Sequence, residues 1–152
     1  MKLNLGFLFI ALSMVFFSCK ENSMVPNEAS ETLLLQLDGV LENLGGDCSA
    51  VQVRTRSLGN FEFNNANALK FKFNGMSDAD LSSISIFYEQ NGIQTNLVNL
   101  ENRDLINSTR EIQTGAPLGN AELFLRVTLK SSVCTGQVFY LTVRDLKIYT
   151  VN

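Results

Sequence analysis

Short stretches of alternating apolar and polar side chains dominate this sequence from residue 31 onward. In residues 122–130, leucines and a valine occupy every second position, 123 to 129. A period of two places successive side chains on opposite faces of a β-strand, of which one is buried. Similar stretches occur at 51–56, 69–73, 84–88, 93–98 and 139–148, separated by Asn, Gly and Ser. Seven or eight short strands of this kind predict an antiparallel β-sandwich.

The segment 31–46 is ambiguous between a helix and strands. Its leucines include a set with helical spacing, but Leu33, Leu35 and Leu37 also alternate up to Asp38-Gly39. A glycine in the middle of a helix costs about 1 kcal/mol, which favours strands. Asp-Gly and Asn-Gly pairs are typical of two-residue hairpins, so we expect turns at 38–39, 74–75 and 91–92.

The last stretch changes its phase. Apolar residues occupy odd positions up to Val143 and even positions from Leu146. A strand cannot change parity without an extra residue, so the sequence predicts a β-bulge at Arg144-Asp145.

The order of these stretches and the ending YLTVRDLKIY (140–149) resemble the jelly-roll domains of the galactose-binding and carbohydrate-binding-module type. The resemblance implies a jelly-roll sandwich and a carbohydrate as a candidate partner. An immunoglobulin-like sandwich is the alternative, although the chain has no tryptophan and its cysteines lie further apart than the usual pair between sheets.

An uncharged apolar run, Leu3 to Phe17, follows Lys2 at the amino terminus. It has the order of a secretory signal and is too short for a membrane span of about 20 residues. We expect residues 1–18 to be a signal peptide with a signal helix, 19–30 a polar tether containing Pro26, and 31–152 a single domain.

The residues Phe16-Phe17-Ser18-Cys19 resemble a bacterial lipoprotein lipobox of the Bacteroidota type. The resemblance implies a diacylglycerol on Cys19 and an acylated amino terminus. Several acyl chains, at about 0.8 kcal/mol per buried methylene, anchor a protein durably to a membrane. Lys20-Glu21 resembles the charged signal for the outer face, so we expect lipid anchoring in the outer membrane with surface exposure. A plain secretory signal is the alternative.

The two remaining cysteines, Cys48 and Cys134, lie in turn-like sequences. In an exported chain such a pair predicts one disulfide, joining two loops at one end of the sandwich and stabilising the fold by about 4 kcal/mol. A metal site is not expected, because no histidine or further thiol completes a tetrahedral set.

The charge and composition exclude several function classes. Removal of residues 1–18 takes away only Lys2, leaving 11 basic and 15 acidic residues, so nucleic acid is not an expected partner. Without histidine there is no Ser-His-Asp or Cys-His arrangement. Asp78, Asp80 and Glu89 have part of the spacing of a Ca²⁺ loop, but position six is Ser83 instead of Gly, and we interpret 78–82 as a solvated turn and expect no cofactor.

Strand alternation also predicts a candidate ligand face. The basic and aromatic side chains that point outward by this pattern are Arg54, Arg56, Lys70, Lys72, Phe87, Phe124, Arg126 and Lys130, together with Arg144. If their strands share one sheet, they form a basic surface with two rings for stacking; if not, they are ordinary solvated or edge-strand positions. The tyrosines at 88, 140 and 149 are further candidates for stacking on a sugar.

Together these features favour a non-enzymatic, lipid-anchored binding or accessory module of a bacterial envelope, with a glycan as its candidate ligand. The first alternative is a structural lipoprotein that docks onto another envelope protein. The second is a small enzyme with two carboxylates, which requires a close Asp or Glu pair in a cleft.

Overall fold

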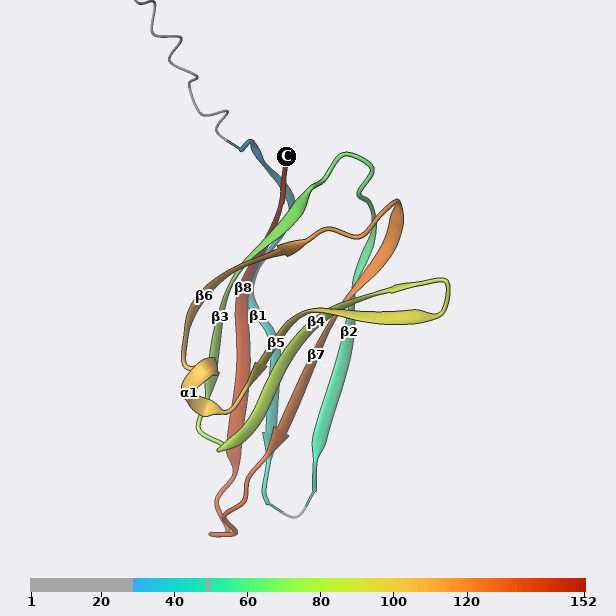
Figure 1. Cartoon of the computed structure of the whole chain (residues 1–152). Helices are drawn as coiled ribbons and strands as arrows, with labels where there is room; N and C mark the ends of the chain where they lie inside the picture. The colour runs from blue at the N-terminus through green and yellow to red at the C-terminus, as the bar shows by residue number, and fades with distance from the viewer. Residues whose placement is uncertain (1–28, 49) are drawn as a thin grey trace, which may run out of the picture.

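The computed structural model describes residues 29–48 and 50–152, which form eight strands and one short helix (Figure 1). The elements are β1 (Glu31–Gly46), β2 (Gln52–Glu62), β3 (Ala68–Ser77), β4 (Leu81–Gln90), β5 (Ile93–Glu101), α1 (Arg103–Ile106), β6 (Ser108–Gly115), β7 (Asn120–Lys130) and β8 (Phe139–Val151). The expected signal helix, Cys19 and most of the tether lie outside the described residues. Within those residues no helix is long and apolar enough to cross a membrane.

Two four-stranded antiparallel sheets pack face to face. Sheet A has the order β1-β8-β3-β6, and sheet B has the order β2-β7-β4-β5. The pairs β1–β8, β2–β7, β3–β6 and β4–β5 are all antiparallel neighbours. The chain is therefore arranged as a long hairpin rolled into two sheets, which is the jelly roll. The predicted fold class is confirmed, and the immunoglobulin-like order is not the one observed.

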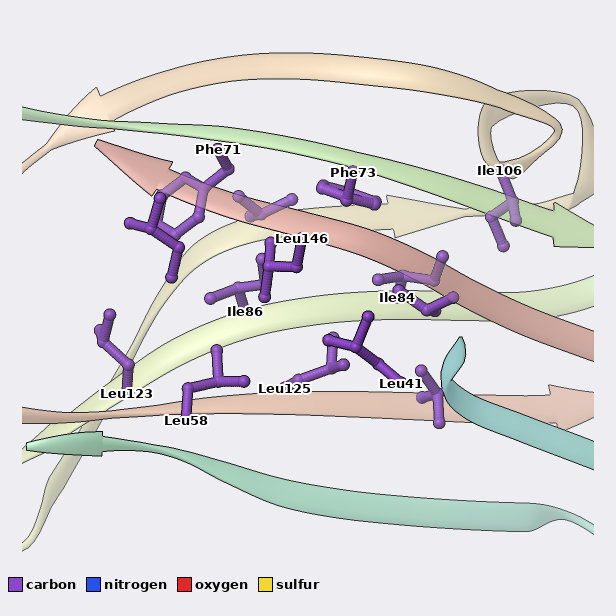
Figure 2. Packing of buried hydrophobic residues seen from close by; sticks show 14 of the residues in the cluster. Leu41, Leu58, Phe71, Phe73, Ile84, Ile86, Ile106, Leu123, Leu125 and Leu146 are labelled. Carbon is purple, nitrogen blue, oxygen red and sulfur yellow. The ribbon is translucent and has the colours of Figure 1, made fainter. Parts of the chain in front are cut away.

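The core lies between the inner faces of the two sheets (Figure 2). Its side chains come from alternate positions of the central strands, as a period of two requires: Leu69, Phe71 and Phe73 of β3, Ile84 and Ile86 of β4, and Leu123 to Leu129 of β7. Ile106 of α1 is also fully buried and covers one end of this core. The alternation read from the sequence is correct for these central strands.

At the tip of the rolled hairpin, β4 turns into β5 through Asn91 and Gly92. Both residues have positive φ, 54° and 75°. This is the backbone of a type I′ turn, which Asn-Gly favours because its twist matches that of the strands. The turn predicted at 91–92 is confirmed.

The hairpin predicted at Asp38-Gly39 is wrong. β1 is one continuous strand from Glu31 to Gly46, and Gly39 (φ 79°) lies in a bulge between the partners of Leu37 and Val40. The bulge predicted at Arg144-Asp145 in β8 lies opposite it and is confirmed by the pairing with β3, where Asp145 and Leu146 face one residue; Asp145 has a φ of 53°. The Asp145 carboxylate accepts a 2.8 Å hydrogen bond from the Gly39 N–H, so a side chain of the β8 bulge satisfies the main chain of the β1 bulge.

The turn predicted at Asn74-Gly75 is also wrong, because β3 continues to Ser77. A Cβ on Gly75 would lie 2.8 Å from the Ile84 side chain and 3.1 Å from the Ile106 carbonyl oxygen. Gly75 also bridges to Asn107, directly after α1. The glycine therefore allows a close approach of another backbone and not a reversal of the chain.

Different segments of the chain lie at the two ends of the sandwich (Figure 1). β1 begins and β8 finishes at the same end, where Glu31 pairs with Val151. At the opposite end Gly46 pairs with Phe139, and the β1–β2 and β7–β8 connections meet there. We call the first the terminal end.

Candidate functional site

The predicted disulfide joins the two connections that meet opposite the terminal end. Cys48 and Cys134 are bonded across 86 residues of sequence with a Cα–Cα distance of 5.2 Å. We call this end of the sandwich the disulfide end. It comprises Cys48, the β3–β4 turn (78–80), α1, the β7–β8 loop (131–138) and the strand ends that adjoin them, including the start of β8. The bond fixes the middle of a loop that lies outside the strands.

Two aspartates of the β3–β4 turn hold the β7–β8 segment in place. Asp80 accepts hydrogen bonds from the hydroxyl and from the N–H of Ser132, the latter at 2.9 Å. Asp78 accepts one at 2.5 Å from the N–H of Tyr140, whose carbonyl accepts one from the Asp78 N–H. The Ser132 hydroxyl, followed by its N–H, lowers the pKa of Asp80 from 3.8 to about 2. The loop is therefore fixed by charge-assisted bonds as well as by the disulfide.

The turn itself is held by buried hydroxyls and an amide. Ser77 and Ser82, both buried, share a 2.6 Å hydrogen bond beneath it. The Asn107 side chain, directly after α1, accepts from the Ser77 N–H at 2.6 Å and donates to the Ser77 carbonyl at 2.7 Å. Asn107 thus extends the edge of β3 with two bonds resembling those of a strand ladder, and α1 is tied to the turn.

On the outer side of sheet A, Tyr140 forms one wall of a shallow pocket. Tyr140 is 50% exposed, and its ring lies over Gly45 of β1, where a Cβ would be 3.0 Å from the ring. The pocket has a volume of about 220 Å³ and is lined by Met76, Ser77, Asp78, Asn107, Tyr140 and Thr142. It combines an aromatic ring and a thioether with carboxylate, amide and hydroxyl groups. We call it the tyrosine pocket.

A second pocket shares Asp78 with the tyrosine pocket, and we call it the arginine pocket. Its volume is about 360 Å³, and it is lined by Asp78, Asp80, Arg103, Ser131, Val133, Thr135, Gln137 and Phe139. Within the described residues the Arg103 guanidinium forms no ion pair. The guanidinium has five N–H donors, which adds to the polar groups of this pocket.

The part of the chain that the structure describes contains no cluster of three His, Cys, Asp or Glu side chains close enough to hold a metal ion. Asp78 and Asp80, which had part of the spacing of a Ca²⁺ loop, instead accept hydrogen bonds from Tyr140 and Ser132. Glu89 lies near the far end of β4, paired across the sheet with Gln94 and Glu122.

The predicted ligand face is not brought together on one surface. Arg54 and Arg56 belong to β2, an edge strand, and pair with the inward-facing Val127 and Leu125. Their side chains therefore lie on the inner side of sheet B, because opposite residues share a face. Arg56 donates to the Leu41 carbonyl at 3.0 Å, and Arg54 pairs with Glu42 at 3.4 Å, so both link β2 to β1. The outward orientation expected for these arginines is wrong.

Lys70 and Lys72 lie on the outer face of sheet A, away from the other members of the set. Lys70 is 2.6 Å from both Glu31 and Glu111, and these carboxylates raise its pKa, with Glu111 the larger cause. Lys72 is 3.1 Å from Glu111 and lies over the Tyr149 ring. These lysines belong to a local network of ion pairs and are not a free basic patch.

Phe87, Phe124, Arg126 and Lys130 lie on the outer face of sheet B. Phe87 is only 1% exposed, because the Phe124 ring stacks on it at 5.2 Å and the Arg126 guanidinium lies 4.5 Å from its centroid. Arg126 also donates to Gln94 and Thr55, on the two edge strands. Phe87 is therefore covered and cannot stack on a ligand, whereas Phe124 is partly exposed.

The three tyrosines have different settings. Tyr88 packs against the core, and Tyr149 is partly buried beside Lys72. Tyr140 is half exposed and is bordered by a pocket. All three tyrosines were predicted from the sequence as stacking candidates. Nothing in the sequence predicted Met76, Arg103 and Asn107 as site residues, because only the fold brings them beside Tyr140 or Asp78.

No protein-family model and no curated protein matches the chain. Among solved structures, it is similar to the carbohydrate-binding module TmCBM61 in complex with β-1,4-galactotriose, at 12% identity over 71% of this chain and 88% of that chain, with a TM-score of 0.39. It is also similar to the CBM36-1 domain of a multidomain xylanase from the hindgut metagenome of Trinervitermes trinervoides, at 15% identity over 78% and 90%, with a TM-score of 0.34. The assignment of the jelly roll rests on the strand order and not on these likenesses.

Proposed function

We propose that this protein is a non-catalytic, lipid-anchored binding module of a bacterial envelope whose disulfide end binds a neutral glycan. The observation that carries the proposal is the half-exposed Tyr140 ring beside Asp78 and Thr142, in a pocket whose walls are fixed without a ligand. A sugar ring has an apolar C–H face and a rim of hydroxyls. An aromatic face bordered by carboxylate, amide and hydroxyl groups complements both.

The rigidity of the disulfide end supports binding. The β7–β8 loop is held by the Cys48–Cys134 bond and by Asp80, and Asp78 holds the start of β8. A ligand entering such a site does not have to order the loop, so less of the interaction energy is lost on binding.

The local charge favours a neutral ligand. Asp78 and Asp80 line the pockets together with a single arginine, Arg103. The mature chain expected from the sequence is also acidic, with 15 acidic and 11 basic residues once Lys2 is removed. Like charges brought together at an interface cost free energy, so an acidic polysaccharide is disfavoured.

Asp80 does not suit acid catalysis. A general acid in a two-carboxylate enzyme needs a raised pKa so that it holds a proton near neutral pH. The pKa of Asp80 is lowered to about 2 by Ser132 instead. Its oxygens are occupied as hydrogen-bond acceptors, which supports an anchoring role and a binding module over an enzyme.

Binding is tested with the intact protein, extracted from membranes in mild detergent and applied to a glycan array. We expect Tyr140→Ala to weaken binding to the recognised glycan about tenfold or more, as is common for an aromatic anchor. The matched control is Tyr149→Ala, also on the outer side of β8 but at the terminal end. Absence of binding to every glycan, or equal losses in the two variants, would contradict the proposed site.

The lipid anchor is supported by the sequence around Cys19, before the described residues. β1 begins at the terminal end, so a tether from Cys19 would direct the disulfide end away from the membrane. In cells fed an alkyne-tagged fatty acid, the wild-type chain should become labelled and fractionate with the outer membrane, whereas Cys19→Ala should not be labelled. Labelling of Cys19→Ala would contradict the anchor. We also propose exposure on the outer face, which protease accessibility in intact cells would test.

Docking onto another envelope protein is a second candidate function. Val53 lies in the edge strand β2, and Val51 directly precedes this strand; they are 56% and 51% exposed. Exposed apolar side chains on an edge strand are more typical of an interaction site than of a solvated edge. Crosslinking in intact cells separates the two functions. One protein partner at constant stoichiometry, lost in Val53→Lys but retained in Tyr140→Ala, would favour docking.

A further inference from the structure

The tyrosine pocket and the arginine pocket adjoin each other. Asp78 lines both, while Tyr140 lines the first and its neighbour in β8, Phe139, lines the second. Successive side chains of a strand point to opposite faces of the sheet. The main chain at the start of β8 therefore lies between the two pockets. Asp78 and this main chain therefore separate the two pockets, and we call them the Asp78 ridge.

The ridge is rigid. The Asp78 carboxylate accepts from the Tyr140 N–H at 2.5 Å, and the Asp78 N–H donates to the Tyr140 carbonyl at 3.2 Å. Asn107 clamps the preceding residue, Ser77, with two further hydrogen bonds. A ligand therefore meets two pockets at a fixed separation and cannot merge them by pushing the ridge aside.

Neither pocket alone is large. Their volumes are about 220 and 360 Å³, below and only slightly above the lower limit of the roughly 300–1,000 Å³ usual for small-molecule sites. Their chemistry is complementary. The first has the exposed tyrosine, and the second has the Gln137 amide and the Arg103 guanidinium, which forms no ion pair with any residue that the structure describes. One compact ligand in either pocket would leave the groups of the other without a partner.

We infer that the ligand is a chain of at least two linked neutral sugar units that crosses the Asp78 ridge, with one unit on Tyr140 and the next beside Arg103 and Gln137. The inference rests on the proposed function and names its ligand class as an oligosaccharide or polysaccharide, in contrast to a free monosaccharide. Two linked contacts strengthen each other, because binding of the first unit places the second at a high effective concentration.

The test is competition against the immobilised polysaccharide that the intact protein recognises on the array. The competitors are the matching monosaccharide and the linear oligomers of two to six units, drawn from neutral gluco-, galacto-, manno- and xylo-oligosaccharides. We expect the dimer or trimer to compete at least about tenfold better than the monosaccharide. A monosaccharide that competes as well as every oligomer would overturn the inference while leaving the proposed function standing.

Arg103→Ala and Gln137→Ala separate the two pockets, with Arg144→Ala as the control, since Arg144 is exposed in β8 away from both pocket linings. We expect the first two variants to reduce the advantage of the oligomers over the monosaccharide at least threefold, with their thermal unfolding showing that they fold. Unchanged competition by all oligomers in both variants would overturn the inference. No binding to any glycan by the wild type would instead overturn the proposed function.

Discussion

The two ends of this jelly roll hold their loops by different means. At the terminal end the loops are held by hydrogen bonds. Main-chain bonds run from Phe63 to Gly119, from Asn67 to Val151 and from Asn152 to Ser30, and the Gln90 side chain donates to the Leu118 and Asn120 carbonyls. At the disulfide end the β7–β8 loop is fixed by the Cys48–Cys134 bond and the carboxylate of Asp80. Hydrogen bonds hold the loops of the terminal end, whereas the β7–β8 loop at the disulfide end is held by a covalent bond as well.

The pockets at the two ends also differ. The pocket at the terminal end, of about 270 Å³, is lined by Glu62, Asn64, Asn65, Ala66, Thr150 and Asn152. Those groups are amides, a carboxylate, a hydroxyl and a methyl, without the ring and guanidinium of the disulfide end. The proposed function therefore belongs to the end that has the aromatic ring, the guanidinium and the disulfide.

Removal of the disulfide should have the largest effect. In Cys48→Ala/Cys134→Ala we expect the free energy of unfolding to fall by about 4 kcal/mol, because the unfolded chain loses a long closed loop. Urea denaturation of the wild type with and without reductant, beside this variant, measures it. A loss below about 1 kcal/mol would mean that the hydrogen bonds of Asp78 and Asp80 suffice to hold this end.

Gly75→Ala should cost about 1–3 kcal/mol, since the new methyl would meet the Ile106 carbonyl and the Ile84 side chain within a packed core. Gly115→Ala is the control, because a Cβ there has no neighbour within 4 Å. Denaturation curves of the two variants decide the matter. Equal stabilities would show that α1 moves freely against β3, in conflict with a rigid disulfide end.

The contribution of Asp80 should depend on pH. Its pKa is about 2 in the folded protein and 3.8 in the unfolded chain, so the stabilisation is present above pH 3.8 and is lost as the pH falls towards about 2. Urea denaturation between pH 2 and 6 should show a smaller pH dependence for Asp80→Asn than for the wild type. Asn64→Ala, at the terminal end, should keep the wild-type profile. Identical profiles in all three proteins would rule out Asp80 as a charged anchor.

Gly45→Ala should produce the smallest change, and mainly in binding. The added methyl would lie 3.0 Å from the Tyr140 ring, which must shift by a few tenths of an ångström, while β1 keeps its pairing. We expect a few-fold weaker affinity for the recognised glycan and a change in stability within about 0.5 kcal/mol. Unchanged affinity would indicate that the position of this ring is not part of the site.

The sequence predicted the features that depend on local pattern. The structure confirms the alternation in β7, the turn at Asn91-Gly92 and the parity change at Asp145. Each of these features is determined by residues that are neighbours in the sequence. The disulfide was also predictable, from the cysteine count and the expected export.

Features that depend on tertiary neighbours were not predictable. Gly39 and Gly75 have the local signature of turns, but Asp145 faces one and Ile106 packs on the other. The direction of Arg54 is determined by its partner Val127 and not by its own strand. Tyr140 was visible as a candidate, whereas its pocket exists only because β8 starts beside the turn at Asp78.

The most direct measurement is NMR of the intact protein in detergent micelles with ¹³C-labelled tyrosine rings, titrated with the glycan that the array identifies. The chain has three tyrosines, and they lie in the core (Tyr88), at the disulfide end (Tyr140) and towards the terminal end (Tyr149). We expect saturable shifts of the Tyr140 ring signals alone. Shifts of Tyr149 with Tyr140 unchanged, or saturable binding that moves no tyrosine signal, would contradict a glycan site at the disulfide end.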